Sequence, residues 1–409
     1  MGLLPESQLD EILAKSKSGV QFAADALQKS IVSGLLKNYS NLDIINLPYL
    51  LPWPKCYSEI QSPDSFRETH CNNGTERYTL ENWQFLNIPV IRFIDRYRIT
   101  RRALYQYCKK NENEEIFVLI YAISTPFIKA AVDVKKSFPN LKIIQIAPDL
   151  PQYMSENDGA LRSALKKMNQ KLLRSLYRKT DGFVILTKCM AEQLVTDNQP
   201  YTVMEGIYNP ADDKFSDSIV STEIKRIVYT GTLARRYNIM DLIESVQNLE
   251  RNDFVLEIYG DGDTKQEIID ISRKDPRIKY CGILSRNEIL KVQRQAFLLV
   301  NPRKGHEEFT KFSFPSKTME YLASGTPTLI NRMKGIPDEY YEYCFCCDDD
   351  NNASFAKKIE QILDMDWTQL RQFGDTARNF VLTRKNPVVQ TQKIANLITT
   401  LSNIETINN

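Results

Sequence analysis

A lysine and a glutamate three residues apart, Lys317 and Glu320, are the side chains of this 409-residue chain best placed to bind a charged ligand. Their spacing puts both on one face of a helix. A lysine can neutralise phosphate groups, and a carboxylate can accept hydrogen bonds from ribose hydroxyls, so the pair would suit a nucleotide-sugar. An ordinary surface ion pair has the same spacing, and spacing alone favours neither interpretation.

The helix that carries this pair is expected from about Phe314 to Ser324. Ser313 is a good N-cap, Pro315 suits the first turn, and Gly325 suits the end. The first turn of such a helix presents unpaired N–H groups and the positive end of its dipole, a natural seat for a diphosphate. The residues expected at this anion-binding end are Ser313, Phe314, Pro315 and Ser316.

Short apolar runs alternate with longer segments of helical period along most of the chain. The runs expected as strands are 42–47, 116–121, 141–146 and 182–186, and then 226–231, 254–260, 297–302 and 328–330. This alternation predicts an α/β protein with parallel sheets covered by helices on both faces. Ligands of such sheets bind beyond the carboxyl ends of the strands.

A polar stretch around Pro210 interrupts the alternation. We therefore expect an N-terminal α/β domain over 1–208, a linker over 209–224, a C-terminal α/β domain over 225–385, and a C-terminal helix and tail over 386–409. Two such units would form a cleft.

The segment from 308 to 327 resembles the donor-binding helix of glycosyltransferase family 4. The resemblance implies the GT-B fold, in which two Rossmann-like domains have parallel sheets facing across a cleft and a C-terminal helix returns to the first domain. Residues 320–327 match the family's glutamate, small-residue run and Gly-x-Pro, which implies that Glu320 binds the ribose of the donor. The form of the motif at residues 314–320, Phe-Pro-Ser-Lys-x-x-Glu, resembles the variant found in bacterial surface-polysaccharide transferases.

One position departs from the family pattern. Many members carry a second glutamate eight residues before the first, in contact with the donor sugar, and this chain has Phe312 there. Glu307 or Glu308 would have to supply that contact from a different loop.

A second resemblance covers 229–242, which is similar to the first strand and loop of the family's second domain. In that loop a basic residue stabilises the leaving diphosphate, and the resemblance implies this role for the nearby arginines, because the family's usual basic positions hold Thr232 and Tyr237. Solvated arginines at a helix start are the alternative. The resemblance implies Arg236 and Lys317 as catalytic cations, and donor contacts from Gly231, Thr232 and Arg235.

Further resemblances imply residues near the base of the donor and on the acceptor side of the cleft. Gly260 and Gly262 are similar to the family's Gly-x-Gly turn near the base, although a tight chain reversal would need the same glycines. Asp149 and Glu205 resemble residues on the acceptor side. A turn aspartate between two prolines is the alternative interpretation of Asp149.

The resemblance implies a retaining glycosyltransferase that moves a sugar from a nucleotide-sugar donor to a glycan or lipid-linked saccharide, with the departing diphosphate helping to deprotonate the acceptor. The nucleotide-sugar is a substrate, and no cofactor or metal is expected, since the chain has two histidines and no CxxC pair. A nucleotide-sugar epimerase of the same fold and an inactive partner subunit of a polysaccharide assembly complex are the alternatives.

Residues 92–110 hold seven basic side chains against one acid, with interleaved aromatics. Such an amphipathic basic helix can lie on an anionic membrane, or it can pack its tyrosines inward and its arginines outward. The net charge of +2 argues against a nucleic-acid partner. Without a secretory signal or an apolar run long enough to span a membrane, a cytoplasmic protein is expected, on the inner face of the membrane if the basic helix binds there.

Overall fold

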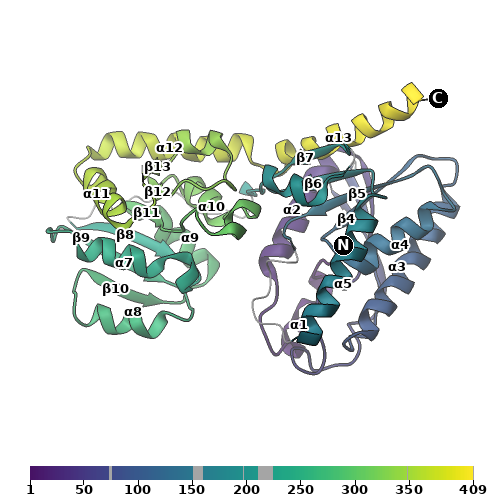
Figure 1. Cartoon of the computed structure of the whole chain (residues 1–409), viewed down its shortest axis with the longest axis horizontal. Coiled ribbons are helices and arrows are strands. Elements are labelled where there is room, and N and C mark those ends of the chain that lie inside the picture. The colour runs from purple at the N-terminus through teal and green to yellow at the C-terminus, as the bar shows by residue number, and fades with distance from the viewer. Residues whose placement is uncertain (73–75, 151–159, 197, 211–223, 348, 409) are drawn as a thin grey trace. The chain divides into compact units, whose positions relative to one another are not determined.

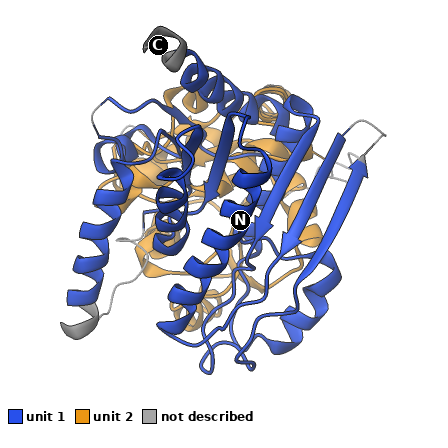
Figure 2. Ribbon diagram, turned by 90° about the vertical axis from the view of Figure 1, so that its right-hand side faces the viewer, with its two compact units in different colours: residues 1–207, 387–409 blue, residues 208–386 orange. Residues whose placement is uncertain are grey.

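The computed structural model describes residues 1–72, 76–150, 160–196, 198–210, 224–347 and 349–408 (Figure 1). The chain folds into two compact units (Figure 2). Unit 1 consists of Met1–Ile207 with Pro387–Asn409, and unit 2 of Tyr208–Asn386. Most of the expected linker, residues 211–223, lies outside the described residues.

Unit 2 is built on a parallel sheet with the strand order β10-β9-β8-β11-β12-β13. Its strands are β8 (Lys225–Thr230), β9 (Phe254–Tyr259), β10 (Ile278–Gly282), β11 (Leu298–Asn301), β12 (Thr328–Ile330) and β13 (Phe345–Cys346). Its helices are α7 (Ile239–Gln247), α8 (Lys265–Ser272), α9 (Arg286–Arg294), α10 (Ser316–Ser324), α11 (Asn352–Leu363) and α12 (Trp367–Arg384). Short 3-10 turns span Arg235–Tyr237, Glu308–Phe312 and Asp338–Glu342.

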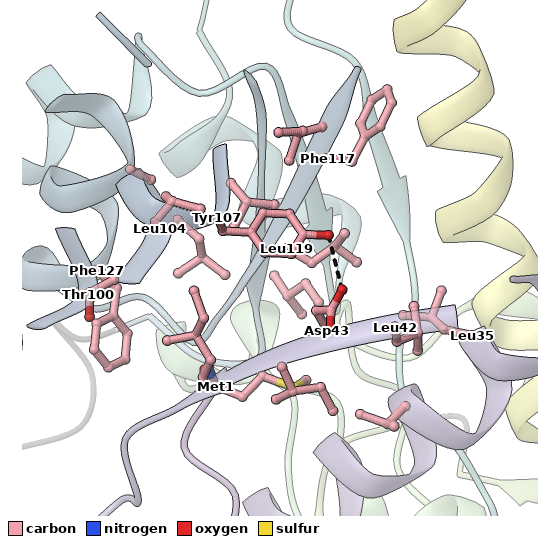
Figure 3. A pocket seen from close by; sticks show the side chains of 18 of the residues that line it. Met1, Leu35, Leu42, Asp43, Thr100, Leu104, Tyr107, Phe117, Leu119 and Phe127 are labelled. Atoms are coloured by element: carbon pink, nitrogen blue, oxygen red, sulfur yellow. Dashed lines mark hydrogen bonds between the residues drawn. The ribbon is translucent and has the colours of Figure 1, made fainter. Parts of the chain in front are cut away.

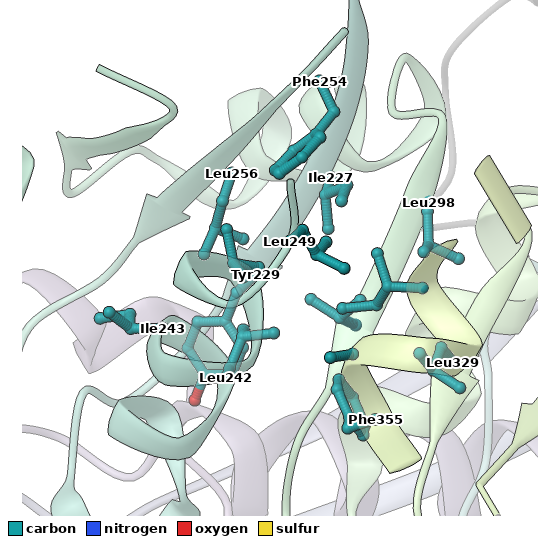
Figure 4. Packing of buried hydrophobic residues seen from close by; sticks show 14 of the residues in the cluster. Ile227, Tyr229, Leu242, Ile243, Leu249, Phe254, Leu256, Leu298, Leu329 and Phe355 are labelled. Atoms are coloured by element: carbon teal, nitrogen blue, oxygen red, sulfur yellow. The ribbon is translucent and has the colours of Figure 1, made fainter. Parts of the chain in front are cut away.

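The core of unit 2 follows from the two-residue period of its buried strands. Ile227 and Leu298 pack with Leu242 of α7 and Phe355 of α11 in one buried cluster (Figure 4). Their strand neighbours Val228 and Leu299 pack with Tyr321 of α10 in another. The second cluster anchors α10, the helix of the candidate site, on the sheet.

Unit 1 contains two sheets. One has the order β4-β5-β6-β7 with parallel pairs, and the other has the order β1-β3-β2, in which β1 and β3 are parallel but β2 and β3 are antiparallel. The strands are β1 (Asn41–Asn46), β2 (Phe66–Asn72), β3 (Glu76–Asn82), β4 (Ile116–Tyr121), β5 (Leu141–Ala147), β6 (Gly182–Ile185) and β7 (Tyr201–Val203). The antiparallel β2–β3 pair was not expected from the strand–helix alternation.

The helices of unit 1 are α1 (Leu9–Lys15), α2 (Phe22–Asn38), α3 (Ile91–Lys110), α4 (Thr125–Lys135), α5 (Ala160–Tyr177), α6 (Ala191–Leu194) and α13 (Pro387–Asn408), with 3-10 turns at Glu6–Gln8 and Lys188–Met190. The C-terminal helix α13 packs against α2. Gly34 permits this contact, since a Cβ atom there would lie 2.2 Å from the Pro387 carbonyl oxygen. The α/β class and the return of the C-terminal helix to the first unit are thereby confirmed.

Candidate functional site

The first turn of α10 has no side-chain cap, and the helix differs in detail from the expectation. The helix begins at Ser316, and Pro315 is its N-cap, without a side-chain hydrogen bond to the first turn. The prediction that Ser313 caps the helix was wrong, and its hydroxyl instead accepts a hydrogen bond from Arg303 Nη2 at 2.9 Å. Gly325 ends the helix in the left-handed conformation, with φ of 77°, as expected. An uncapped first turn leaves N–H groups available for an anion.

Lys317 lies against the backbone of Gly231, directly after β8. A Cβ atom at position 231 would lie 2.4 Å from Lys317 Cε, and φ of Gly231 is 154°, so a larger residue would push the lysine away. Within the described part of the chain no carboxylate forms an ion pair with this lysine. Burial lowers the pKa of Lys317, while Glu320 raises it and Arg286 lowers it. A half-buried cation without an ion-pair partner is prepared to receive an anion.

The carboxylate of Glu320 is held by two residues of α9, Gln293 and Arg286. Gln293 of α9 donates from Nε2 to Glu320 Oε1 at 2.6 Å and to the hydroxyl of Thr230 at 3.0 Å. Arg286 NH1 lies 3.6 Å from Glu320 Oε2. Because Arg286 is exposed and its contact is long, Oε2 keeps acceptor capacity for a ligand.

Tyr321 ties α10 to the end of β8. Its hydroxyl accepts a hydrogen bond from Thr230 N at 2.9 Å and donates one to Thr230 O at 3.1 Å, in a fully buried setting. These two bonds attach α10 to the last residue of β8, and Gly231 is the next residue of the chain. Lys317 and Glu320 therefore lie at the carboxyl edge of the sheet, as expected of a ligand site in this fold class.

The loop after β8, which contains Gly231, packs closely against the loop after β9, which contains Gly260 and Gly262. A Cβ atom on Gly260 would be 1.7 Å from Gly231 O, and one on Gly262 would be 2.3 Å from Leu233 O. Gly231 N donates to Tyr259 O at 2.8 Å, and Leu233 N donates to Asp261 O at 2.8 Å. These glycines are thus explained by the packing of the two loops, and their contact with a donor stays a prediction.

The two arginines of the β8–α7 loop have different surroundings. Arg235 forms an ion pair with Glu267 of α8, and both side chains are exposed. Arg236 lies over the ring of Tyr237, 5.1 Å from its centroid. Thr232 is exposed, and its carbonyl accepts a hydrogen bond from the Tyr229 hydroxyl at 2.9 Å. The roles of Arg235, Arg236 and Thr232 stay predictions.

Arg303 was missed by the sequence reasoning. It is the second residue after β11, and its guanidinium lies 4.8 Å from the ring centroid of Phe309 and 5.2 Å from that of Tyr237. Its Nε is buried without a hydrogen-bond partner, and burial lowers its pKa. Among the described residues no carboxylate forms an ion pair with it. Its position after a strand, in Asn-Pro-Arg, was the signal that could have identified it.

The residues before α10 are largely buried. Phe312, at the position where the family has a second glutamate, is 6% exposed. Phe314 packs against Tyr340, with ring centroids 5.2 Å apart. Glu307 and Glu308 are exposed and Ser316 is exposed, whereas Pro315 is buried. The packing of Phe314 and Pro315 shapes the approach to the helix, and their donor contacts stay predictions.

The two candidate acceptor residues of unit 1 differ in exposure. Asp149 follows β5 and is exposed. Glu205 is buried, and its Oε2 accepts a hydrogen bond from Lys393 Nζ of α13 at 3.2 Å. That bond ties the C-terminal helix to unit 1, so Glu205 has a structural contact of its own, and a role of either residue in acceptor binding stays a prediction.

The basic residues of α3 are divided between buried and exposed positions. Arg92 and Arg96 are buried, contrary to the expectation of outward arginines, and they donate to the carbonyls of Leu50 at 2.7 Å and Leu47 at 3.1 Å. Its other basic residues and several apolar ones are exposed: Arg98, Arg101, Arg102, Lys109, Lys110, Ile91, Phe93 and Ile94. A search of the described helices finds none both long and apolar enough to cross a membrane.

Part of the chain matches a known protein family, and the chain resembles solved structures at low identity. Residues 224–365 match the family model "Glycosyl transferases group 1". No curated protein sequence matches the chain. Among solved structures, the chain is similar to sucrose-phosphate synthase from Thermosynechococcus elongatus, with a TM-score of 0.59 and 14% identity over 95% of each chain.

Two further solved structures are similar at low identity. HepE from Anabaena in complex with UDP has a TM-score of 0.57 and 14% identity, covering 78% of this chain and 86% of that one. The E. coli trehalose-6-phosphate structure bound with UDP-2-fluoro glucose has a TM-score of 0.61 and 9% identity, covering 91% and 95%. Unit 2 therefore matches the glycosyl transferases group 1 family over its sheet, and the chain has the GT-B fold of a two-domain glycosyltransferase.

Proposed function

We propose that this protein is a retaining glycosyltransferase of the family 4 type, moving a sugar from a nucleotide-sugar donor to a glycan or lipid-linked saccharide in surface-polysaccharide biosynthesis. The observation that supports the proposal is that α10 has an uncapped first turn and carries both Lys317, which lies beside Gly231, and the carboxylate of Glu320. This arrangement lies inside the segment that matches the glycosyltransferase family. The similar structures of HepE and the E. coli protein hold UDP or a UDP-sugar analogue, which supports a nucleotide-sugar as ligand.

In the proposed mechanism the diphosphate binds the first turn of α10 and the amine of Lys317, and Glu320 accepts hydrogen bonds from the ribose. Negative charge grows on the diphosphate as the sugar–phosphate bond breaks, and preorganised cations at that point lower the barrier. Arg303 and Arg236, whose guanidinium groups both lie over the ring of Tyr237, are two further cations that we assign to this stabilisation. The departing diphosphate takes the proton of the acceptor hydroxyl, and the sugar keeps its anomeric configuration.

The function is tested first by ligand binding and then by the product. In a thermal-shift assay with UDP, ADP, GDP and CDP, the nucleoside diphosphate whose base the site binds should raise the unfolding temperature of the protein. With the corresponding nucleotide-sugars and a lipid-linked acceptor, NMR should show a product with the same anomeric configuration as the donor. An inverted product would contradict the retaining mechanism, and no shift with any nucleotide would contradict the whole proposal.

An inactive partner subunit remains the second candidate, because the buried Phe312 replaces an acidic contact to the donor sugar. Such a subunit would show the nucleotide shift but release no sugar, even when a membrane acceptor is present. Release of labelled sugar by the purified chain would exclude this candidate. An epimerase would convert the nucleotide-sugar alone, without any acceptor.

We also propose that α3 contacts an anionic membrane surface, which would bring the enzyme to a lipid-linked acceptor. The exposed Phe93 and Ile94, each 57% exposed, stand near the exposed Arg98 and Arg101 on this helix. The double variant Phe93→Ser/Ile94→Ser should lose binding to phosphatidylglycerol vesicles in a sedimentation assay. Leu165→Ser/Met168→Ser, which removes exposed apolar residues from α5, is the matched control and should bind normally. Equal binding by both variants would contradict the membrane contact.

A further inference from the structure

Two cysteines separated by one residue lie at the edge of the sheet in unit 2. β13 consists of Phe345 and Cys346, stands last in the strand order and pairs with β12. Because side chains alternate along an extended backbone, Cys344 and Cys346 share one face, whereas Phe345 packs on the other against Phe373 of α12, with ring centroids 4.7 Å apart. The sulfur atoms of Cys344 and Cys346 are 3.9 Å apart, and both thiols are reduced. The fold thus brings two thiols together on one short segment.

The two thiols differ in their surroundings. Cys344 is 5% exposed and donates a hydrogen bond from its sulfur to the Tyr340 carbonyl at 3.3 Å, whereas Cys346 is partly exposed. Hydrogen bonding to Cys346 and burial raise the pKa of the Cys344 thiol, while the charge of Arg332 lowers it. Cys344 therefore keeps its proton, and Cys346 is the sulfur that an oxidant in solution reaches.

A disulfide between these residues does not fit the extended backbone of β13. In a strand the Cα atoms of residues two apart are separated by about 6.6 Å, and their Cβ atoms by a similar distance. A disulfide joins Cβ atoms about 3.5–4.5 Å apart. Closing the bond therefore bends residues 344–346 and draws the backbone of β13 away from β12. The ladder that is lost is short, since it joins Leu329 to Phe345 and Ile330 to Cys346.

The loop after β12 connects this edge of the sheet with the segment that leads into α10. The Tyr341 hydroxyl accepts a hydrogen bond from Met333 N at 2.8 Å and donates one to Met333 O at 2.9 Å. Further along the loop, a Cβ atom on Gly335 would lie 2.4 Å from the carbonyl oxygens of Ser313 and Thr310. A bend at the cysteine pair therefore acts on a loop that packs closely against residues 310–313.

A buried cysteine of unit 1 supplies the comparison. Cys108 of α3 is fully buried, and burial raises the pKa of its thiol to about 11. The side chains of Leu104 and Tyr107, which precede it on α3, line a cavity of about 550 Å³, where Tyr107 donates a hydrogen bond to Asp43 Oδ2 at 3.1 Å (Figure 3). Among the described residues that line this cavity there is no cysteine. Cys108 is thus as well buried as Cys344, but in the described part of the chain no second sulfur lies within hydrogen-bond distance of it.

We propose that Cys344 and Cys346 form a site of reversible oxidation, at which hydrogen peroxide converts the two thiols into a disulfide that releases β13 from β12. The proposal concerns the edge strand and its thiols, and it holds whichever ligand unit 2 binds.

The oxidation takes two steps. The Cys346 sulfur attacks one oxygen of the peroxide, the O–O bond breaks, and the products are a sulfenic acid and one water. The Cys344 sulfur then attacks the Cys346 sulfur, the S–O bond breaks, and the hydroxyl leaves with the Cys344 proton as a second water. The two thiols lose two electrons, which reduce one peroxide to two waters. Dithiothreitol reverses the reaction by thiol–disulfide exchange.

The test treats the full chain with a small excess of hydrogen peroxide, alkylates the remaining thiols after unfolding, and analyses the tryptic peptides by mass spectrometry. Residues 335–357 form one tryptic peptide, which contains Cys344, Cys346 and Cys347. We expect this peptide to carry the disulfide and a single alkyl group, on Cys347, and to carry three alkyl groups after dithiothreitol. Cys108 should be alkylated as fully as in the untreated chain. The variant Cys281→Ser, which removes a partly exposed thiol from β10, is the matched control and should form the same disulfide.

Hydrogen exchange measures the release of β13. Amides of residues 329–336 and 344–346 should exchange about tenfold or more faster in the oxidised chain than in the reduced chain, because the edge ladder is lost. Exchange in β8 and β9 should be equal in both and reports that both chains stay folded. Peroxide-treated Cys346→Ser should exchange like the reduced parent.

A disulfide between Cys346 and Cys347, or a sulfinic acid on Cys346 with Cys344 still reduced, would overturn the assignment of the pair. The expected disulfide with unchanged hydrogen exchange would overturn the release of β13. Faster exchange in peroxide-treated Cys346→Ser would trace the loosening to another oxidised residue and would overturn it as well.

Discussion

The variant Glu320→Ala is expected to bind a nucleoside diphosphate about 10- to 100-fold more weakly than the parent chain, because hydrogen bonds to a charged group contribute about 1.5–3 kcal/mol. The carboxylate is positioned by Gln293, so the fold does not depend on the ligand to place it. Isothermal titration with UDP, or with the diphosphate that the panel selects, measures the loss.

The matched control is Glu360→Ala, which removes an exposed carboxylate from α11. It should bind like the parent chain. Glu320→Gln separates charge from shape, because an amide can keep the contact to Gln293 and pair with the buried, unpartnered Gln293 Oε1. We expect this variant to fold normally and still bind weakly. Parent-like affinity in Glu320→Ala would remove Glu320 from the binding site.

The second large effect is expected for Lys317→Met, which removes the cation beside Gly231. Loss of one preorganised group at a developing charge typically lowers kcat by about 10²- to 10³-fold. The thermal stability of the ligand-free variant should be equal or higher, because burial lowers the pKa of Lys317 and the folded state therefore disfavours its charged form at neutral pH. Steady-state kinetics and thermal unfolding measure the two effects.

A purely structural lysine would show the opposite combination, with lower stability accompanying the loss of activity. Lys357→Met on the exposed face of α11 is the control and should change neither quantity. The pH dependence gives an independent check. A bound diphosphate would raise the lowered pKa of Lys317, so above that lowered pKa binding takes up a proton and the affinity falls as the pH rises. Lys317→Met should lack this fall.

The strands that the sequence predicts well are the buried ones. The apolar runs at 141–146 and 254–260 appear as β5 and β9 almost residue for residue, because strands buried on both faces read as continuous apolar runs. The pair β2 and β3 was not predicted, since its polar residues, such as Arg67 and Glu68, carry no such signal. Its hairpin depends on cross-strand pairing, which one sequence does not reveal.

The sequence predicts only those parts of the candidate site that depend on local properties of the chain. Lys317 and Glu320 could be found because helix spacing and terminal residues are local properties. Gln293 could not, because its importance comes from its contact with Glu320 across the fold. Arg303 had only its position after a predicted strand as a signal, and its contact with Ser313 depends on the fold. The helix begins at Ser316 and not at the expected Phe314, whose side chain packs against Tyr340.

The central claim, that Glu320 holds the ribose of a nucleotide bound at the start of α10, is tested most directly by comparing UDP with 2′,3′-dideoxy-UDP. If another base is selected by the panel, its ribo- and dideoxy-diphosphates are used. In the parent chain the dideoxy compound should bind about tenfold or more weakly, since its sugar has no hydroxyls to donate. In Glu320→Ala the two should bind equally. A ribose preference that survives unchanged in Glu320→Ala would contradict the account.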